Sequence, residues 1–321
     1  MAEVAEKTEA AVSTEAAAGT PAVKTVELTK RFGSTVALAG LTMTVPRGEV
    51  FGFLGPNGAG KTTAVKLLLG LLRPSSGEGW LLGKPVGDLQ TRRHIGYLPE
   101  LFRYQGWLSA AEVLALHCEL APLPRSSWKD EISTALDTVG LTNRAGDRVG
   151  TFSKGMQQRL GLGAALVGEP ELVFLDEPTS ALDPVGRHDV REIIRGLAAR
   201  GTAVFLNSHL LSEVEQVCDR VAVVDHGRVI ASGTMDELLG GGSAVRVRVS
   251  GLTQADKNGL SSFGRIDDEG DQLTFAKLDP DRVPELVAAI VAKGGRVYEV
   301  APRHETLEDR FLQLLDDEEE K

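Results

Sequence analysis

The stretch GPNGAGKTT, from Gly55 to Thr63, constrains the fold of this chain more than any other. A short apolar run, Val50 to Leu54, precedes it, and the helical pattern KTTAVKLLLGLL starts within it at Lys61. A loop between a strand and a helix presents successive backbone N–H groups as a concave nest at the positive end of the helix, where a polyphosphate can bind. Glycine tolerates positive φ and places no Cβ between backbone and phosphate, which we expect at Gly55, Gly58 and Gly60. The sequence therefore predicts a phosphate-binding loop.

Two side chains of this loop match the chemistry of a bound nucleoside triphosphate. Lys61 would reach the β- and γ-phosphates, and Thr62 would place its hydroxyl on Mg²⁺. The alternative is a glycine-rich turn that precedes a lysine by chance, and the flanking strand and helix patterns disfavour it. The residues expected to hold the nucleotide are Gly55, Pro56, Asn57, Gly58, Ala59, Gly60, Lys61, Thr62 and Thr63.

Two acids and a histidine follow two other apolar runs. LVFLDEP places Asp176 and Glu177 where a buried strand ends, and TAVFLNSH places His209 at the end of another. In phosphate-loop ATPases the first acid holds Mg²⁺ and the second can polarise the attacking water. An imidazole there could hydrogen-bond both Glu177 and the γ-phosphate. Taken alone, adjacent acids at a strand end are ordinary turn residues, and a lone histidine is more often packed or solvent-facing.

The formal net charge of −10 suggests an acidic surface until the charges are located. The first 23 residues carry four acids and one lysine, and the acidic tail at 316–321 carries five acids and one lysine. These two ends together have a net charge of −7 out of the total of −10, so the rest of the chain is nearly balanced. We therefore expect no nucleic-acid-binding surface.

Cysteine content and hydropathy bear on where the chain acts. Cys118 and Cys218 are far apart with no CxxC pair, which indicates neither a disulfide framework nor a zinc site and fits a reducing cytosol. No apolar run reaches the ~18 residues of a membrane span, and the N-terminus lacks a basic-then-apolar signal pattern. Any role at a membrane is expected to come through a partner.

The periodicity divides the chain into two folded units. Residues 1–22, rich in Ala, Glu and Thr, are expected to form a disordered tail. Residues 23–239 alternate strand and helix patterns, which favours a parallel sheet with nucleotide at the carboxyl ends of its strands, and about 105–165 form a helical insert. After the break GGGS, residues 244–315 indicate a small α+β domain of ferredoxin-like type, interpreted as a packing or regulatory module.

Several elements are expected individually. GWLLGKPV is expected as one strand, IGYLPE as a strand that ends at Pro99 and Glu100, and LLSEVEQVCDRV as a helix. VAVVDHGRVIASG is expected as a hairpin turned at His226 and Gly227. In the second unit we expect strands at AVRVRVS, DQLTFAKL and RVYEVAP, helices at VPELVAAIVAKG and TLEDRFLQLL, and a weak short helix near Gln254 to Phe263.

In their order along the chain, these motifs resemble the nucleotide-binding subunits of ABC transporters, from about Val23 to Gly233. The loop at Gly55 corresponds to Walker A and LVFLDE to Walker B. FSKGMQQ, Phe152 to Gln158, is similar to the signature that defines the family, SALD to its D-loop, and NSH to its H-loop. Phe32 matches the aromatic residue that stacks on adenine. The resemblance implies an α/β fold: a P-loop NTPase, ABC-type ATPase domain with a RecA-like parallel sheet, an antiparallel β subdomain and a helical insert.

The resemblance also implies that the signature acts in a second subunit. Ser153 and Gly155 precede a helix whose N-terminus favours an anion, yet they belong to the insert, away from the phosphate loop of their own chain. In the family these residues complete the site of a partner, so that two ATP molecules lie between two subunits. The signature departs from the usual LSGGQ at Phe152, Lys154 and Met156. Such variants, with SALDP and a C-terminal domain ending near TLEDRFL, resemble exporters of the ABC-2 type.

The function implied is an ATPase subunit that binds ATP and Mg²⁺ and powers export of a drug-like, lipid or ionic substrate through a separate integral membrane permease. Its partners would be that permease and a second copy or a paralogous ATPase subunit, at the cytoplasmic face of the cell membrane. Glu177 would be the general base, Lys61 the γ-phosphate clamp, Thr62 and Asp176 the Mg²⁺ ligands, and His209 the residue that links base and phosphate.

Two other functions stay open at this point. A non-transport ABC ATPase of translation or DNA repair usually carries two cassettes or a long coiled coil, and neither pattern is found in this sequence. A regulatory module that holds ATP without turnover is disfavoured by Glu177. The transported substrate cannot be read from this subunit.

Glu100 is the clearest departure from the family pattern, because the family usually has the Q-loop glutamine there. If its carboxylate reaches the metal, it adds a hard oxygen ligand and a full negative charge. We expect Glu100 as a third Mg²⁺ ligand. The alternative is that Glu100 faces the membrane partner and serves coupling alone.

Overall fold

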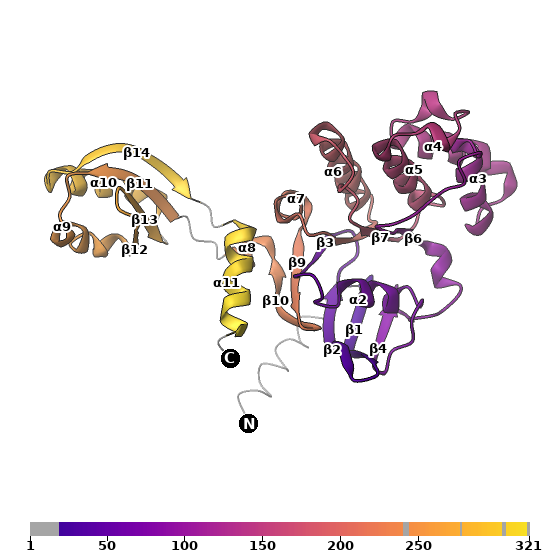
Figure 1. The fold of residues 1–321 in the computed structure, drawn as a ribbon, viewed down its shortest axis with the longest axis horizontal. Coiled ribbons are helices and arrows are strands. Elements are labelled where there is room, and N and C mark those ends of the chain that lie inside the picture. Colours follow the sequence, from indigo (N-terminus) through magenta and orange to yellow (C-terminus); the bar gives the residue numbers. More distant parts are fainter. Residues whose placement is uncertain (1–18, 240–243, 277, 304–305, 320–321) are drawn as a thin grey trace. The chain divides into compact units, whose positions relative to one another are not determined.

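A computed structural model of the protein describes residues 19–239, 244–276, 278–303 and 306–319. The chain forms two compact units that divide between Ser232 and Gly233 (Figure 1). The tail expected at 1–22 lies, as far as residue 18, outside the described residues, and so does the GGGS break at 240–243. The last turns of the helix that ends at Glu319 include most of the acidic tail.

A six-stranded sheet, in the order β10-β9-β3-β8-β7-β6, forms the core of the first unit. The pairs β9–β3, β3–β8, β8–β7 and β7–β6 are parallel, and β3, β7 and β8 are buried along their whole length. Its strands are β3 (Val50–Leu54), β6 (Ile95–Leu98), β7 (Leu172–Asp176), β8 (Ala203–Asn207), β9 (Arg220–Asp225) and β10 (Arg228–Thr234). Continuous apolar runs are typical of parallel strands covered on both faces.

The interior of this sheet is built around one aromatic side chain. The ring centroid of Phe205 on β8 lies 5.1 Å from that of Phe174, 5.2 Å from that of Phe53 and 5.7 Å from that of Phe51. These four rings come from three neighbouring strands and are almost fully buried. Aromatic pairs at such separations add to the hydrophobic stabilisation of the sheet. The strand ends that carry the polar residues therefore project from a rigid support.

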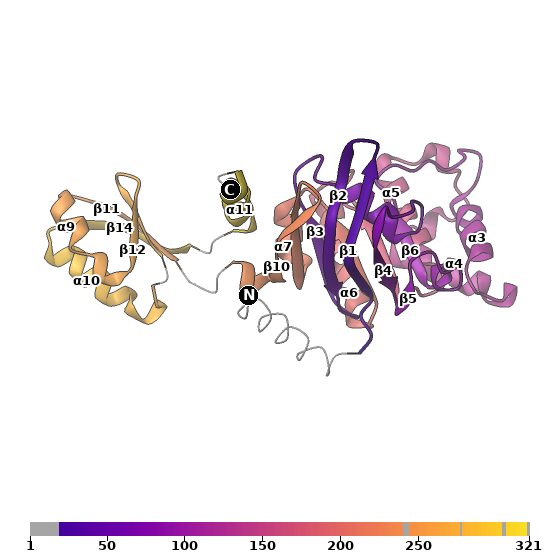
Figure 2. The same ribbon diagram turned by 90° about the horizontal axis from the view of Figure 1, so that it is seen from below.

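An antiparallel sheet in the order β2-β1-β4-β5 covers part of the same core (Figure 2). Its strands are β1 (Val23–Phe32), β2 (Thr35–Val45), β4 (Ser76–Leu81) and β5 (Lys84–Pro85). The prediction of one strand at GWLLGKPV is wrong, because Leu82 and Gly83 take positive φ and turn the chain back. The hairpin predicted at His226 and Gly227 is confirmed, with φ of 45° and 76° at its two turn residues.

Helices surround the central sheet. In the first unit they are α2 (Lys61–Leu68), α3 (Ala110–Leu120), α4 (Trp128–Thr138), α5 (Lys154–Leu166), α6 (Pro184–Ala199) and α7 (Leu211–Val217), with 3₁₀ turns at Thr91–His94, Arg125–Ser127, Thr142–Arg144 and Val149–Thr151. Helices α3, α4 and α5 pack on one another, as Figure 1 shows for the region of the expected insert. Helix α7 is shorter than expected because Arg220 and Val221 belong to β9.

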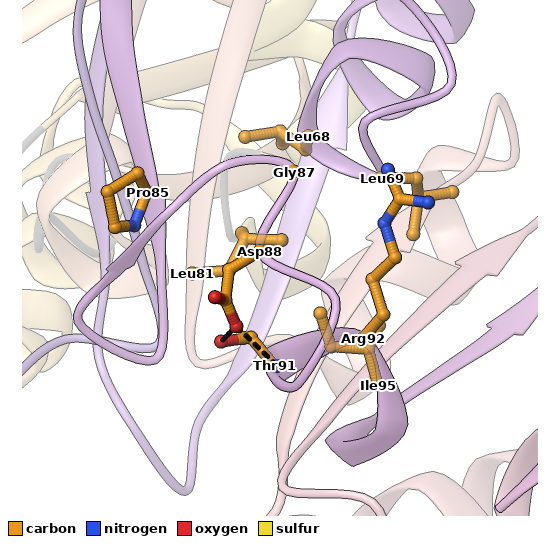
Figure 3. A pocket seen from close by; sticks show the side chains of 9 residues that line it. All are labelled: Leu68, Leu69, Leu81, Pro85, Gly87, Asp88, Thr91, Arg92 and Ile95. Carbon is orange, nitrogen blue, oxygen red and sulfur yellow. Dashed lines mark hydrogen bonds between the residues drawn. The ribbon is translucent and has the colours of Figure 1, made fainter.

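The segment between β5 and β6 lies beside the end of α2 (Figure 3). The carboxylate of Asp88 accepts hydrogen bonds from the Thr91 backbone N–H and hydroxyl, at 2.7 and 2.8 Å, and these bonds lower the pKa of Asp88. The Arg92 guanidinium donates to the Gly70 carbonyl oxygen at 3.0 Å, at the C-terminal end of α2. These contacts fix the start of β6, and Glu100 follows its other end.

The order of strands and helices in the second unit is typical of the ferredoxin-like fold. Its elements are α8 (Met235–Leu238), β11 (Ala244–Ser250), α9 (Gln254–Asn258), β12 (Arg265–Asp268), β13 (Gln272–Ala276), α10 (Val283–Ala292), β14 (Arg296–Arg303) and α11 (Leu307–Glu319), with 3₁₀ turns at Ser261–Phe263 and Pro280–Arg282. From β11 to β14 the order is β-α-β-β-α-β, and the antiparallel sheet runs β12-β13-β11-β14. The ferredoxin-like prediction is confirmed, although β12 was missed because its sequence, RIDD, has one apolar side chain.

Candidate nucleotide site

The phosphate loop joins the end of β3 to the start of α2. Gly60 is the N-cap residue of α2 with φ of 97°, Gly58 has φ of 87°, and no described side chain caps the helix. The first backbone N–H groups of α2 therefore have no capping side chain, and such a helix N-terminus suits an anion. Positive φ was also expected at Gly55, and this is wrong. Gly55 is required for space, because a Cβ there would lie 2.2 Å from the Val224 carbonyl oxygen.

Lys61 lies across the mouth of this loop. Its ammonium group donates to the carbonyl oxygens of Gly55 at 2.7 Å and Pro56 at 3.1 Å. Burial lowers the pKa of Lys61, and the negative charges of Glu177, Asp176 and then Glu100 oppose that shift. Thr62, the next residue, is exposed in the first turn of α2. The loop thus carries a cation next to free helix N–H groups and beside a group of acids.

Asp176 is the last residue of β7 and is only 4% exposed. The side-chain amide of Asn207, its partner in the parallel register with β8, donates to its carboxylate at 2.5 Å. Burial raises the pKa of Asp176, and the charges of Glu100 and Glu177 raise it further. Hydrogen bonds from the Asn207 side chain and the Glu100 backbone oppose this rise. A carboxylate that is buried among other acids is one that a bound cation would stabilise.

Glu177 takes a backbone conformation that L-residues rarely adopt, with φ of 52°. Its carboxylate accepts a hydrogen bond from the His209 backbone N–H at 2.9 Å, and the His209 imidazole Nδ1 lies 2.7 Å from the same oxygen. The Ser208 hydroxyl donates to the other oxygen at 3.3 Å. If Nδ1 carries the proton, Nε2 is left for another partner, and the His209 side chain is 59% exposed. Glu177 is thus held in place while part of His209 faces outward.

Asn207 and Ser208 were missed by the sequence reasoning, which singled out only His209 from NSH. The sequence did contain a signal for them, because Asn207 and Ser208 are consecutive polar residues at the end of a buried strand. Polar side chains in that position find hydrogen-bond partners mainly at the end of a neighbouring strand. Their partners follow from the pairing of β7 with β8, which the local sequence does not specify.

The signature residues lie in a different place. The Ser153 hydroxyl caps α5 by accepting a hydrogen bond from the Met156 backbone N–H at 3.2 Å, and Gly155 belongs to the first turn of that helix. Both line an open hollow of about 520 Å³ with the D-loop residues Leu182 and Asp183, and no residue of the phosphate loop lines it. Asp183 in turn caps α6.

Phe32 and Glu100 stand at the edges of the site. Phe32 ends β1 with its ring half exposed, and the Lys30 ammonium lies 5.0 Å from the ring centroid. Glu100 is exposed just beyond β6. The structure therefore brings Lys61, Glu100, Asp176, Glu177 and His209 into one electrostatic group, and it leaves Ser153 and Gly155 in a separate hollow.

This geometry has counterparts in known proteins. A family model described as ABC transporter matches residues 38–180. An uncharacterized ABC transporter ATP-binding protein of Nostoc sp. is 42% identical over 283 residues, which cover 87% of this chain and 83% of the relative. The chain belongs to the ABC transporter ATP-binding proteins. The resemblance carried by its motifs is therefore confirmed, and so is the fold expected from it.

Other relatives and solved structures agree with this assignment. The Nod factor export ATP-binding protein I of Rhizobium sp. is 34% identical over 299 residues, covering 91% of this chain and 96% of the relative. The linearmycin resistance ATP-binding protein LnrL of Bacillus subtilis is 33% identical over 298 residues, covering 89% and 95%. A solved ATP-binding subunit of an ABC transporter is 31% identical with a TM-score of 0.64, and the match covers 68% of this chain and 92% of that one.

Membership of this family settles the general activity. The chain is an ATPase subunit that binds nucleotide and couples ATP hydrolysis to transport. Subunits of this family dimerise and work with a membrane permease; a solved relative from Clostridium perfringens, 29% identical with a TM-score of 0.62 over 69% of this chain and 92% of its own, is described as part of the complex cbiONQ. Within the described part of this chain, no helix is both long and apolar enough to cross a lipid bilayer.

Proposed function

We propose that this ATPase subunit powers an exporter and that Glu177 is the general base of its reaction. The observation that carries the proposal is the fixed position of the Glu177 carboxylate. The backbone N–H and the imidazole Nδ1 of His209 hold it at the end of β7, together with the Ser208 hydroxyl. It lies beside Asp176 and close enough to Lys61 for their charges to interact. A carboxylate held in this way can accept the proton of a water that attacks the γ-phosphate.

The roles of the neighbouring residues follow from their chemistry. Lys61 would exchange its two carbonyl partners for the β- and γ-phosphates when ATP enters the loop. With a proton on each ring nitrogen, the imidazolium of His209 would donate from Nε2 to the γ-phosphate and from Nδ1 to Glu177. The loop from Gly55 to Thr63 would hold the phosphates through its backbone, and the half-exposed ring of Phe32 would stack on the adenine.

The residues at the strand ends fit Mg²⁺. Among the described residues no cluster of three or more His, Cys, Asp or Glu side chains forms a complete metal cage. Mg²⁺ is usually held by one or two carboxylates together with phosphate oxygens, so an incomplete set of protein ligands is what an Mg²⁺–nucleotide site needs. Thr62 and Asp176 would hold the ion, with Glu100 as the third candidate. When bound, the ion neutralises charge that develops on the phosphates.

The second half of the site would come from another subunit. Ser153 and Gly155 lie at the N-terminus of α5 in a hollow that contains no residue of the phosphate loop. A helix N-terminus that lines an open hollow suits the γ-phosphate of a nucleotide held by a partner. We therefore propose two ATP molecules between two copies of this chain, or between this chain and a paralogous subunit.

Export, and the membrane partner, rest on two further observations. The Rhizobium relative is named for Nod factor export and matches nearly its whole length. Shortly after Glu100 in the sequence, Leu101 and Trp107 are 86% and 71% exposed. Large apolar side chains in water are typical of a surface that another protein covers. An integral membrane permease bound there would hold the subunit at the cytoplasmic face of the membrane. The relatives named above give no support to a role in translation or DNA repair.

The test is the substitution Glu177→Gln. We expect turnover to fall by at least ~10², because the amide accepts no proton, while ATP binding persists and an ATP-bound dimer accumulates. Size-exclusion chromatography with ATP and a steady-state ATPase assay measure the two effects. Glu192→Gln on α6 is the matched control, since Glu192 is exposed and pairs with Arg195. Near-normal turnover in Glu177→Gln would remove Glu177 from this role.

A further inference from the structure

Gln158 is a buried polar residue of the signature helix with partners outside that helix. It is 6% exposed on α5. Its side-chain amide donates to the backbone carbonyl oxygens of Glu177 at 3.3 Å and Pro178 at 3.2 Å. Its neighbour Gln157 instead donates to the Phe152 carbonyl oxygen at 3.2 Å, within the signature itself. Of these two adjacent glutamines, Gln158 alone bonds to the segment that carries the proposed base.

The backbone of Glu177 depends on such partners. Its φ of 52° is unfavourable for an L-residue, so surrounding contacts must hold it there. Its N–H donates to the Asn207 carbonyl oxygen at 2.9 Å, and its carbonyl oxygen accepts from the Ser180 hydroxyl at 3.1 Å and from Gln158. The direction of the carboxylate follows from this backbone conformation. A partner of the carbonyl oxygen therefore acts on the position of the carboxylate.

We propose that Gln158 is a positioning residue for Glu177, and that it ties the base of one ATP site to the signature helix that completes the other. This inference rests on the proposed function. Ser153, which caps α5, and Gln158 lie five residues apart on one helix, about 7.5 Å along its axis. When Ser153 contacts a nucleotide held by the partner, this end of α5 is fixed in position. Through its hydrogen bond to the Glu177 carbonyl oxygen, the Gln158 amide then restrains the backbone of Glu177 in its own chain.

A packing role for Gln158 predicts something different. A buried glutamine that only satisfies two carbonyl oxygens stabilises the fold, and its replacement would lower thermal stability without a specific effect on turnover. A positioning role predicts that the rate falls while nucleotide affinity holds, because the side-chain hydrogen bonds of Gln158 go to Glu177 and Pro178 and not to the phosphate loop. It also predicts that the effect of changing Gln158 disappears when Glu177 can no longer act as a base.

The experiment is a double-mutant cycle in the full-length subunit, with ATP as substrate. Gln158→Met keeps the length of the side chain and removes the donor; we expect kcat to fall about tenfold and KM for ATP to change less than twofold. In the Glu177→Gln background, measured in single turnover, Gln158→Met should cause no further loss. Gln157→Met is the matched control. Because Gln157 does not act through Glu177, any fold-loss of rate that Gln157→Met causes should be the same in the Glu177→Gln background as in the unsubstituted protein.

A second variant covers the case in which Gln158→Met folds poorly. Gln158→Glu has the same shape, but its carboxylate repels the two carbonyl oxygens until it is protonated and can donate. Its kcat relative to the unsubstituted protein should rise as pH falls. Three results would each overturn the inference. The first is a normal kcat in Gln158→Met, and the second is a Gln158→Met loss of rate that multiplies with the loss caused by Glu177→Gln. The third is a kcat of Gln158→Glu, relative to the unsubstituted protein, that does not change with pH. If Glu177→Gln itself turns over normally, the proposed function fails and this inference fails with it.

Discussion

Replacing Asn207 by leucine should destabilise the first unit through Asp176. The side-chain amide of Asn207 donates to a carboxylate that is almost fully buried beside other acids. A hydrogen bond to a charged group contributes about 1.5–3 kcal/mol, and its loss leaves the carboxylate with less compensation for burial. Leucine recovers part of this loss through apolar burial. It also removes the side-chain oxygen Oδ1 of Asn207, which is buried and has no hydrogen-bond partner among the described residues. We expect a net loss of about 2 kcal/mol in the free energy of unfolding.

Thermal unfolding without nucleotide measures this loss. For a domain of 150–250 residues, 1 kcal/mol corresponds to roughly 2–4 °C, so Tm should fall by about 4–8 °C. The control is the double variant Asp176→Leu with Asn207→Leu, in which donor and acceptor are both removed. Because replacing both partners by apolar groups is nearly neutral, Asn207→Leu should cost little in that background. A Tm change below about 1 °C, or equal losses in both backgrounds, would show that Asn207 does not support Asp176.

Three further outcomes follow from the site. Gly55→Ala should abolish ATP binding, since its Cβ would lie 2.2 Å from the Val224 carbonyl oxygen. A Cβ at Gly58 would have no atom within 4 Å, so Gly58→Ala should cost only the ~1–2 kcal/mol of a left-handed backbone at a non-glycine residue. Equilibrium binding of a fluorescent ATP analogue compares the two variants, and equal affinities would contradict the steric argument. Glu100→Gln should shift the Mg²⁺ concentration for half-maximal ATPase activity several-fold, because one charge against a divalent ion at ~4 Å and an effective dielectric of ~20 contributes up to about 8 kcal/mol before desolvation. An unchanged Mg²⁺ curve with altered substrate-stimulated turnover would assign Glu100 to coupling. His209→Ala should lower kcat at least tenfold, since Glu177 loses its Nδ1 partner, and unchanged kcat would mean that the backbone N–H of residue 209 suffices.

The parts of the site that the sequence predicted are those whose geometry is local. A phosphate loop is specified by glycines between one strand and one helix, so its position and its end at Lys61 could be read directly. Even there the reason for Gly55 differs from the one expected, because the crowding comes from Val224, far away in the sequence. The ends of β7 and β8 were equally readable, since the apolar runs stop at Asp176 and at Asn207, which are polar.

The parts that could not be predicted depend on contacts between distant segments. Asn207 supports Asp176 because β7 and β8 pair in one register, and Gln158 reaches Glu177 because α5 packs beside the end of β7. In the second unit, the βαββαβ order was hidden because β12 has two exposed aspartates and one partly buried isoleucine at the edge of its sheet. Hydrophobic periodicity identifies strands that bury one face, and β12 buries little.

The central claim is that one subunit supplies the phosphate loop and the base while another supplies the signature, and a mixing experiment tests it most directly. Lys61→Ala removes the clamp, and Ser153→Arg blocks the N-terminus of α5, so each variant alone should be inactive. Mixed together, with the membrane partner present if dimerisation requires it, they should regain activity, because one site in each mixed dimer pairs an intact Lys61 with an intact Ser153. No recovery in a mixture shown to form mixed dimers would mean that the signature serves its own chain, contrary to this account.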